Sequence, residues 1–286
     1  SLSRNPVRAL TIGGAVIALL TAPVFWIKIG LPARNWWPTA TEAGQGVQTL
    51  DQLGVANIIL PVRVVVELPE GQRATSAAGL RGLRALSDSL RADPRVTQVR
   101  SIVDLEPGTG ILQYSILYSD MAEARKEYGD FLDAYLSTDE RVALIDVILG
   151  DTTSLTSGMD VSQRARDLAK TPPKQLKDAT IVVGGYTAAS LDLQDVLLHR
   201  FPMLVFLILA CTGIMLAIVF RSVLVPIKAV IMNTLSVSAT FGLIVLVFQY
   251  GIGAGIFGLD GATSAIFVVV PVLVFAVVFG LSMDYE

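Results

Sequence analysis

The chain has 286 residues and a formal net charge of −3, and 52% of its residues are hydrophobic while only 16% are charged. Because soluble domains usually carry about 25% charged residues, this composition excludes a wholly soluble protein. No cluster of Lys and Arg is present, which argues against nucleic-acid binding. The single cysteine, Cys211, excludes an intrachain disulfide. The charge deficit lies in four apolar runs, so we predict a membrane part and one soluble domain of roughly 160 residues.

The first apolar run extends from Ala9 to about Ile29. A membrane-spanning helix needs about 20 apolar residues, and this run is long enough. A signal peptide would have a shorter apolar core followed by a small-residue cleavage site. The run instead continues through Pro23, Phe25 and Trp26, which favours an uncleaved span.

Alternating periodicities between about Asn35 and Leu198 predict a mixed α+β domain. Leucines at helical spacing and runs rich in Val and Ile mark its helices and strands. The expected elements, in chain order, are a connecting helix over 41–53, a strand over 58–68, a helix over 74–92, a strand over 96–103, a helix over 121–135, a strand over 141–149, a short helix over 161–169 and a strand over 180–183. Without the 121–135 helix, which we regard as an insertion, this is the strand–helix–strand order, twice, of a ferredoxin-like split unit.

From Thr187 onward no helix breaker occurs before Pro202, so we expect one helix to run from the domain into the second apolar run. The later apolar runs cover about 201–220, 227–248 and 263–279. Soluble helices seldom stay apolar on every face for this long. We therefore predict four membrane helices, the last one truncated, plus an α+β domain. The boundaries are 1–33 for the first segment, 34–198 for the domain and 199–286 for the remaining spans.

The distribution of basic residues predicts the orientation in the membrane. Arg4 and Arg8 precede the first run, and Arg221 and Lys228 flank the link between the second and third, whereas residues 251–262 contain no Lys or Arg. The positive-inside rule then places the N-terminus and the Arg221 link in the cytoplasm and the α+β domain outside it. Basic residues also occur on the opposite flank: Lys28, Arg34 and Arg200.

Two segments resemble a known family. Residues 220–226 read Phe-Arg-Ser-Val-Leu-Val-Pro, and residues 280–286 read Gly-Leu-Ser-Met-Asp-Tyr-Glu. Both resemble the MMPL family (mycobacterial membrane protein large), a branch of the RND transporter superfamily, whose members have two tandem halves of six spans. The chain is similar to the second, C-terminal half, truncated within its fourth span and without the N-terminal half.

The resemblance implies export of lipids or other hydrophobic compounds across the bacterial plasma (inner) membrane, driven by the proton motive force. It assigns a proton relay to Asp284 and Tyr285, with Ser282 as a further relay group and Gly280 allowing close helix contact. An ionised carboxylate at the centre of a membrane helix costs at least about 2.5 kcal/mol, so uptake and release of a proton are plausible chemistry there. From the pattern alone, Asp284 could equally be the solvated end of a helix.

Other functional classes find little support. His199 is the only histidine, which excludes a His-based triad or a multi-His metal site within the chain. No G-x-x-x-x-G-K-[ST] motif occurs, so an ATP-driven pump is not indicated. We therefore expect no enzyme activity, catalytic residue, cofactor, metal or nucleic-acid partner. The expected partners are a lipid substrate, protons, the membrane and the missing N-terminal half. A membrane-anchored lipid-binding or scaffold module and a protein-translocation accessory of the same superfamily remain alternatives.

Overall fold

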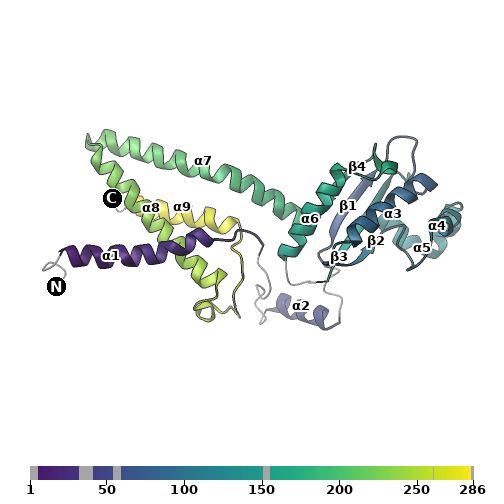
Figure 1. The fold of residues 1–286 in the computed structure, drawn as a ribbon, viewed down its shortest axis with the longest axis horizontal. Coiled ribbons are helices and arrows are strands. Elements are labelled where there is room, and N and C mark those ends of the chain that lie inside the picture. The colour runs from purple at the N-terminus through teal and green to yellow at the C-terminus, as the bar shows by residue number, and fades with distance from the viewer. Residues whose placement is uncertain (1–5, 32–40, 54–58, 151–154, 260, 285–286) are drawn as a thin grey trace. The chain divides into compact units, whose positions relative to one another are not determined.

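The computed structural model describes residues 6–31, 41–53, 59–150, 155–259 and 261–284 (Figure 1). The chain divides into two compact units, residues 42–191 and residues 1–41 together with 192–286. We call the first the α+β unit and the second the helical unit, and describe each by itself.

The α+β unit contains one four-stranded antiparallel sheet with the strand order β2-β3-β1-β4. In chain order the strands are β1 (Val62–Glu67), β2 (Val96–Arg100), β3 (Val142–Leu149) and β4 (Thr180–Gly184). Two strand–helix–strand units, β1-α3-β2 and β3-α6-β4, therefore interleave, since β3 lies between β1 and β2. Strand β2 ends three residues before the predicted Val103, because a turn from Ser101 to Asp104 follows it. Ile58, the predicted start of β1, lies outside the described residues.

The α-helices in the described part of this unit are α2 (Glu42–Gln52), α3 (Ala77–Arg91), α4 (Ile111–Leu117), α5 (Met121–Tyr135) and α6 (Leu155–Lys170). The hydroxyl of Ser76 accepts a hydrogen bond from the Gly79 N–H and caps the N-terminus of α3. The prediction of a short helix over 161–169 was wrong at its start, since α6 begins at Leu155. Leu155 and Met159 extend its buried face by more than one turn. The seven-residue α4 was not predicted.

The core of this unit lies between the sheet and helices α3 and α6, which contact each other and the strands (Figure 1). On β3, alternate residues Ala143, Ile145 and Val147 are buried in this core. Asp146 points to the other face, where the Tyr135 hydroxyl of α5 donates a hydrogen bond to its carboxylate at 2.9 Å. The sheet thus has a helix-covered apolar face and a second face on which polar groups are paired.

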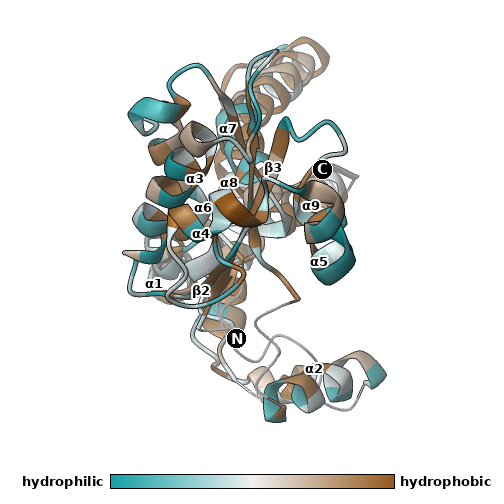
Figure 2. Ribbon diagram, turned by 90° about the vertical axis from the view of Figure 1, so that its right-hand side faces the viewer, coloured by the Kyte–Doolittle hydropathy of each residue, from teal (hydrophilic) through white to brown (hydrophobic). Residues whose placement is uncertain are grey.

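The helical unit is built from α1 (Pro6–Thr21), most of α7 (Tyr186–Phe220), α8 (Leu224–Ile244) and α9 (Val269–Asp284). Figure 2 shows α7, α8 and α9 as predominantly hydrophobic. Among the described residues, two helices, Tyr186–Phe220 and Leu224–Gln249, are long and apolar enough to cross a membrane. The other two predicted spans correspond to the shorter apolar helices Thr11–Trp26 and Val269–Leu281.

Compared with the predicted runs, α1 ends early, at Thr21, and α9 begins late, at Val269, because the apolar residues next to them form other structure. After Thr21 the chain tightens into a 3-10 turn, Ala22–Trp26, which contains Pro23. Ile29 then forms a parallel bridge with Ile266. The Ile266 N–H donates to the Lys28 carbonyl at 2.7 Å, and the Gly30 N–H donates to the Ile266 carbonyl at 3.0 Å. Apolar residues that were predicted to be helical therefore form a short extended pair.

A π-helical turn, Val245–Gln249, ends α8 and places the buried Gln249 beside this extended pair. The Gln249 side-chain amide donates to the Trp26 carbonyl at 2.9 Å, and its oxygen accepts from the Lys28 N–H at 2.8 Å. One side chain thus satisfies two backbone groups that the end of the first helix leaves open.

The apolar surface of α7 is largely uncovered by the described residues. From Met203 to Phe220 its large side chains are mostly exposed, with Phe206 at 72% and Ile218 at 71%. Cys211 lies in the same stretch and is also exposed. An exposed apolar surface of this length suits contact with lipid or with further membrane helices.

Candidate functional site: the α9 relay segment and a polar pocket

The first candidate site is the end of α9, where the predicted relay residues lie. Phe275 and Phe279 of α9 stack on each other and pack with Val237 of α8. Near the other end of α9, Ile244 and Val270 line one small apolar cavity. The two helices therefore run antiparallel, and α8 covers the Phe275 face of α9.

The opposite face of α9 is uncovered within the described residues. Leu273 and Val277 are 59% and 57% exposed, and Gly280 is exposed as well. At about 100° per residue, position 284 lies on this face, in line with 273, 277 and 280. The close helix contact predicted for Gly280 is not made by the described part of the chain, since a Cβ built there has no atom within 4 Å.

The structure describes only part of the predicted relay. The backbone of Ser282 and Asp284 belongs to α9, whereas Tyr285 lies outside the described residues. By helical register, position 282 returns to within about 20° of Phe275, and position 284 lies about 180° from it. The two positions are thus on different faces of α9, with 282 toward α8 and 284 on the uncovered face.

A buried amide of α8 lies level with this segment. Asn233 is only 3% exposed. On α8 it comes eleven residues before Ile244, and on α9 Leu281 comes eleven residues after Val270. Since α8 and α9 are antiparallel and Ile244 is level with Val270, Asn233 is level with residue 281. Buried polar groups in apolar helices are costly and mark functional or packing positions.

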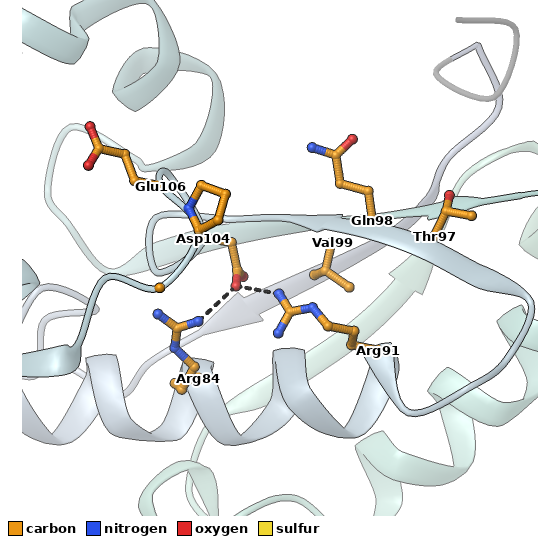
Figure 3. Close-up of a pocket in the computed structure, with 9 residues that line it drawn as sticks. Arg84, Arg91, Thr97, Gln98, Val99, Asp104 and Glu106 are labelled. Carbon is orange, nitrogen blue, oxygen red and sulfur yellow. Dashed lines mark hydrogen bonds and ion pairs between the residues drawn. The ribbon is translucent and has the colours of Figure 1, made fainter. Parts of the chain in front are cut away.

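The second candidate site is a polar cavity of about 320 Å³ in the α+β unit. It lies between α3, the edge strand β2 and the loop that follows β2. Figure 3 shows Arg84 and Arg91 rising from α3 toward Asp104, with Val99 pointing to the same side of β2. Thr97 and Gln98 project from β2 on the other side (Figure 3). Glu106, Pro107 and Gly108 complete the lining.

Asp104 organises this cavity. One carboxylate oxygen accepts from Arg84 at 3.1 Å and from Arg91 at 2.6 Å. The other accepts from the buried hydroxyls of Ser87 at 2.7 Å and Ser101 at 2.6 Å. With its side chain 4% exposed and four donors around it, the Asp104 carboxylate is fully paired. It therefore holds the two guanidinium groups in place and is not itself open to a ligand.

Further contacts fix the rim of the cavity. Arg84 also donates to the Thr109 carbonyl at 2.8 Å and lies over the Tyr114 ring. The Tyr128 hydroxyl donates to the Glu106 carboxylate at 3.1 Å. This hydrogen bond raises the pKa of Tyr128 to about 12, so the phenol stays protonated and remains a donor. The rim side chains are thus positioned before any ligand arrives.

A model of the MMPL family matches residues 35–286. The chain belongs to the MMPL family. In this family member, the segment that resembled the family at residues 220–226 forms the tight turn between α7 and α8. Arg221 adopts a left-handed φ of 47°. Pro226 lies in the first turn of α8, where backbone N–H groups have no acceptor within the helix, so the N–H that proline lacks costs no helical hydrogen bond.

Curated relatives are bacterial transporters. The "Mycolic acid-containing lipids exporter MmpL11" of Mycolicibacterium smegmatis is 27% identical over 290 residues, which cover 100% of this chain and 26% of the relative. The "Trehalose monomycolate exporter MmpL3" of Mycobacterium tuberculosis is 26% identical over 272 residues, 95% of this chain and 25% of the relative. The "Heme uptake protein MmpL11" of the same organism is 40% identical over 114 residues, 40% of this chain and 12% of the relative. This MMPL chain thus spans about a quarter of the first two relatives.

Sequence reasoning missed the polar pocket. Its charged residues are Arg84 and Arg91 on α3 and Asp104 and Glu106 in the loop after β2. The only available signal was a pair of arginines seven positions apart on one helical face, and that spacing is common on solvated helices. The pairing with Asp104 required the tertiary fold.

Proposed function

We propose that this MMPL chain is the second half of a proton-motive-force-driven exporter of lipids or other hydrophobic compounds. In this proposal the helical unit spans the bacterial inner membrane, with α1 and α9 completing the four spans. The α+β unit lies on the extracytoplasmic side and forms part of the substrate path with the N-terminal half. The names of two relatives, both lipid exporters, support the substrate class.

The observation that carries the relay is the uncovered face of α9. Position 284 continues a line of exposed positions, Leu273, Val277 and Gly280. An acidic residue on a lipid-facing surface is costly, so such residues nearly always face a bundle interior and pair. We infer that this face contacts a helix outside the chain, that Gly280 permits the close approach, and that Asp284 and Tyr285 exchange protons there with the other half. One proton crossing 100 mV supplies about 2.3 kcal/mol.

The test is substrate flux in vesicles that contain the full-length parent protein. We expect wild-type flux to collapse with an uncoupler, and Asp284→Asn to abolish flux while insertion and expression persist. The matched control is Asp51→Asn, which removes an exposed acid on α2 and is expected to transport normally. Flux should be measured in both vesicle orientations, because one relative is named for uptake. Normal, uncoupler-sensitive flux by Asp284→Asn would contradict the relay assignment.

A membrane-anchored lipid-binding module without transport is the second candidate. It is favoured by the polar cavity, whose lining comes entirely from residues 84–108. In that case binding would be measurable, but no flux would depend on a proton gradient in any form of the protein.

A further inference from the structure

Helices α7 and α8 line an apolar groove close to the turn that joins them. We propose that this groove binds one anionic phospholipid of the cytoplasmic leaflet, as a fixed partner and not as exported cargo. One acyl chain lies in the groove, and the phosphate pairs with the side chains of Arg221 and Lys228. The proposal rests on the membrane topology proposed above, in which this turn is cytoplasmic, and not on lipid export.

The groove is a hollow left by small side chains. Its volume is about 400 Å³, within the range of small-molecule sites, about 300–1,000 Å³. A Cβ atom on Gly213 would lie 3.8 Å from the Val230 side chain, so the two helices meet at the floor of the groove. Ala210 and Ala217 flank Gly213 on the same face of α7. The walls are half-exposed isoleucines: Ile214, Ile227 and Ile231.

The lining decides which part of a ligand can lie in the groove. All of its side chains are apolar, so it offers no side-chain hydrogen bond and accepts a hydrocarbon chain. Within a membrane such a chain gains no hydrophobic free energy, because the bilayer is equally apolar. The groove therefore fixes the position of an acyl chain, and any selection among lipids has to come from the charges beside it.

Two basic side chains stand next to the groove. Arg221 comes two residues before Val223, and Lys228 comes between Ile227 and Ile231, and these three neighbours all line the groove. Both basic residues are exposed, and their long stems let the charged ends reach the level of the head groups. Neither of them forms an ion pair within the described residues. The sequence contains no Asp or Glu between residues 195 and 260, so α8 and the turn supply no counter-charge.

The acid of α9 does not supply one either. Lys228 precedes Val237 by nine residues, which places the two about 180° apart around α8. Val237 packs against Phe275 and Phe279 of α9, so Lys228 lies on the side of α8 away from α9. Position 284 lies on the face of α9 that is turned away from α8. The positive charge beside the groove thus remains open to a ligand.

An anionic phospholipid matches both features of this site. Basic pockets between membrane helices on the cytoplasmic side bind anionic head groups, and Arg and Lys both pair with phosphate oxygens. A further membrane helix over the groove would cover the two cations without neutralising them, which is costly. A lipid phosphate neutralises them while its chain fills the hollow. Each cation is expected to contribute about fivefold to the preference for an anionic over a neutral lipid.

The experiment is hydrogen–deuterium exchange of the full-length parent protein in phosphatidylcholine nanodiscs, with or without phosphatidylglycerol of the same acyl chains. We expect phosphatidylglycerol to slow exchange severalfold in peptides within residues 218–228. Arg221→Gln and Lys228→Gln should each reduce this protection about fivefold in its dependence on the phosphatidylglycerol fraction. The matched control is Arg200→Gln, which neutralises an exposed arginine toward the other end of α7 and should retain the wild-type protection.

Two further arms identify the lipid as the source of the phosphate and the groove as its site. Inorganic phosphate added to phosphatidylcholine nanodiscs should give no protection, because it has no acyl chain. Ala217→Leu fills the groove without changing a charge and should remove the protection by phosphatidylglycerol. Its control is Val219→Leu, which enlarges an exposed side chain of α7 outside the groove and should behave as wild type.

Four results would overturn the proposal. Exchange of residues 218–228 that is equal in both lipid mixtures would indicate that protein covers the groove. Equal protection by inorganic phosphate would reduce the site to a free anion site. Equal loss in Arg200→Gln, or full protection in a correctly inserted Ala217→Leu, would reduce the effect to general surface charge.

Two safeguards keep the result interpretable. The Arg221→Gln and Lys228→Gln variants leave the groove intact, so they decide the matter if Ala217→Leu does not insert. The lipid site and the export activity are also tested separately. Protection by phosphatidylglycerol without proton-dependent flux would contradict only the proposed function, and flux without such protection would contradict only the lipid site.

Discussion

The carbonyl oxygen of Leu20 lies 1.6 Å from the position that a Cβ atom on Gly242 would occupy. Helices α1 and α8 therefore touch backbone to backbone at this point. An alanine would favour the helix by about 1 kcal/mol on propensity alone, but the obstacle is a main-chain atom that cannot rotate away. We expect Gly242→Ala to destabilise the helical unit by about 1–3 kcal/mol, measured as a lower thermal midpoint in nanodiscs.

Gly213→Ala on α7 is the matched control. A Cβ there would meet the Val230 side chain at 3.8 Å, an ordinary contact. We expect this variant to be at least as stable as wild type. Equal midpoints for Gly242→Ala and wild type would contradict the close packing of α1 on α8.

Gln249 is expected to hold residues 26–28 to the end of α8. Gln249→Leu leaves the Trp26 carbonyl and the Lys28 N–H without the partners they have in the structure. Each unsatisfied buried group costs about 1–3 kcal/mol. We expect faster hydrogen exchange at Lys28 and a lower thermal midpoint. Unchanged exchange at Lys28 in Gln249→Leu would argue against this role.

Asp93 is expected to give the α+β unit an acid-dependent stability. Its carboxylate is 1% exposed and accepts from Arg95 and Arg164 at 2.8 and 3.3 Å. The hydrogen bond from Arg95, opposed by burial, lowers the pKa of Asp93 to about 2. Because the folded pKa is below the unfolded value of about 3.9, the stabilisation is fully present above pH 4 and is lost as the pH falls toward 2.

The size of this contribution is about 2 kcal/mol, since one pKa unit corresponds to about 1.4 kcal/mol. We expect Asp93→Asn to lower stability at neutral pH by about that amount and to flatten the dependence between pH 4 and 2. Hydrogen exchange of β2 as a function of pH provides the measurement. Asp130→Asn, which changes an exposed acid on α5, should retain the wild-type profile. An identical profile for Asp93→Asn would exclude Asp93 as the titrating group.

Asn233 is expected to assist the relay segment from α8. Asn233→Leu replaces a buried amide with an apolar side chain of similar size, so folding should persist. The variant loses one hydrogen bond, whose free energy corresponds to about a tenfold change in an equilibrium or rate constant. We expect a drop of that order in proton-dependent flux of the full-length parent. Thr234→Ala is the control, because within the described residues the Thr234 hydroxyl donates to the Val230 carbonyl of its own helix. Normal flux in Asn233→Leu would indicate that Asn233 contributes only to helix packing.

The periodicity of the sequence was sufficient to predict those helices and strands that bury one face. The leucines of α3 and the alternation in β3 are examples, since each repeat maps directly onto burial. It failed where backbone pairing decided the conformation. Residues 263–268 are apolar and were expected to be helical, but Ser264 has a φ of 63° and Ile266 pairs with Lys28 and Gly30. Hydropathy carries no information about such partners.

The sequence could indicate the proposed relay only as a motif, and the faces of α9 on which its positions lie required the structure. Nothing in Gly-Leu-Ser-Met-Asp-Tyr-Glu shows that position 282 is turned toward α8 and position 284 away from it. That distinction follows from which side of α9 Phe275 and Phe279 pack against. The Arg84–Asp104–Arg91 cluster was beyond sequence reasoning for a similar reason, because its members meet only when the loop after β2 folds back on α3.

The exposure of Cys211 has a practical consequence. It is the single cysteine of the sequence and lies uncovered on the apolar surface of α7. A thiol-reactive spin label or fluorophore would therefore attach at one defined point of this 286-residue chain without prior mutagenesis. Quenching by lipid-dissolved and by water-soluble agents would then report the immersion depth of α7.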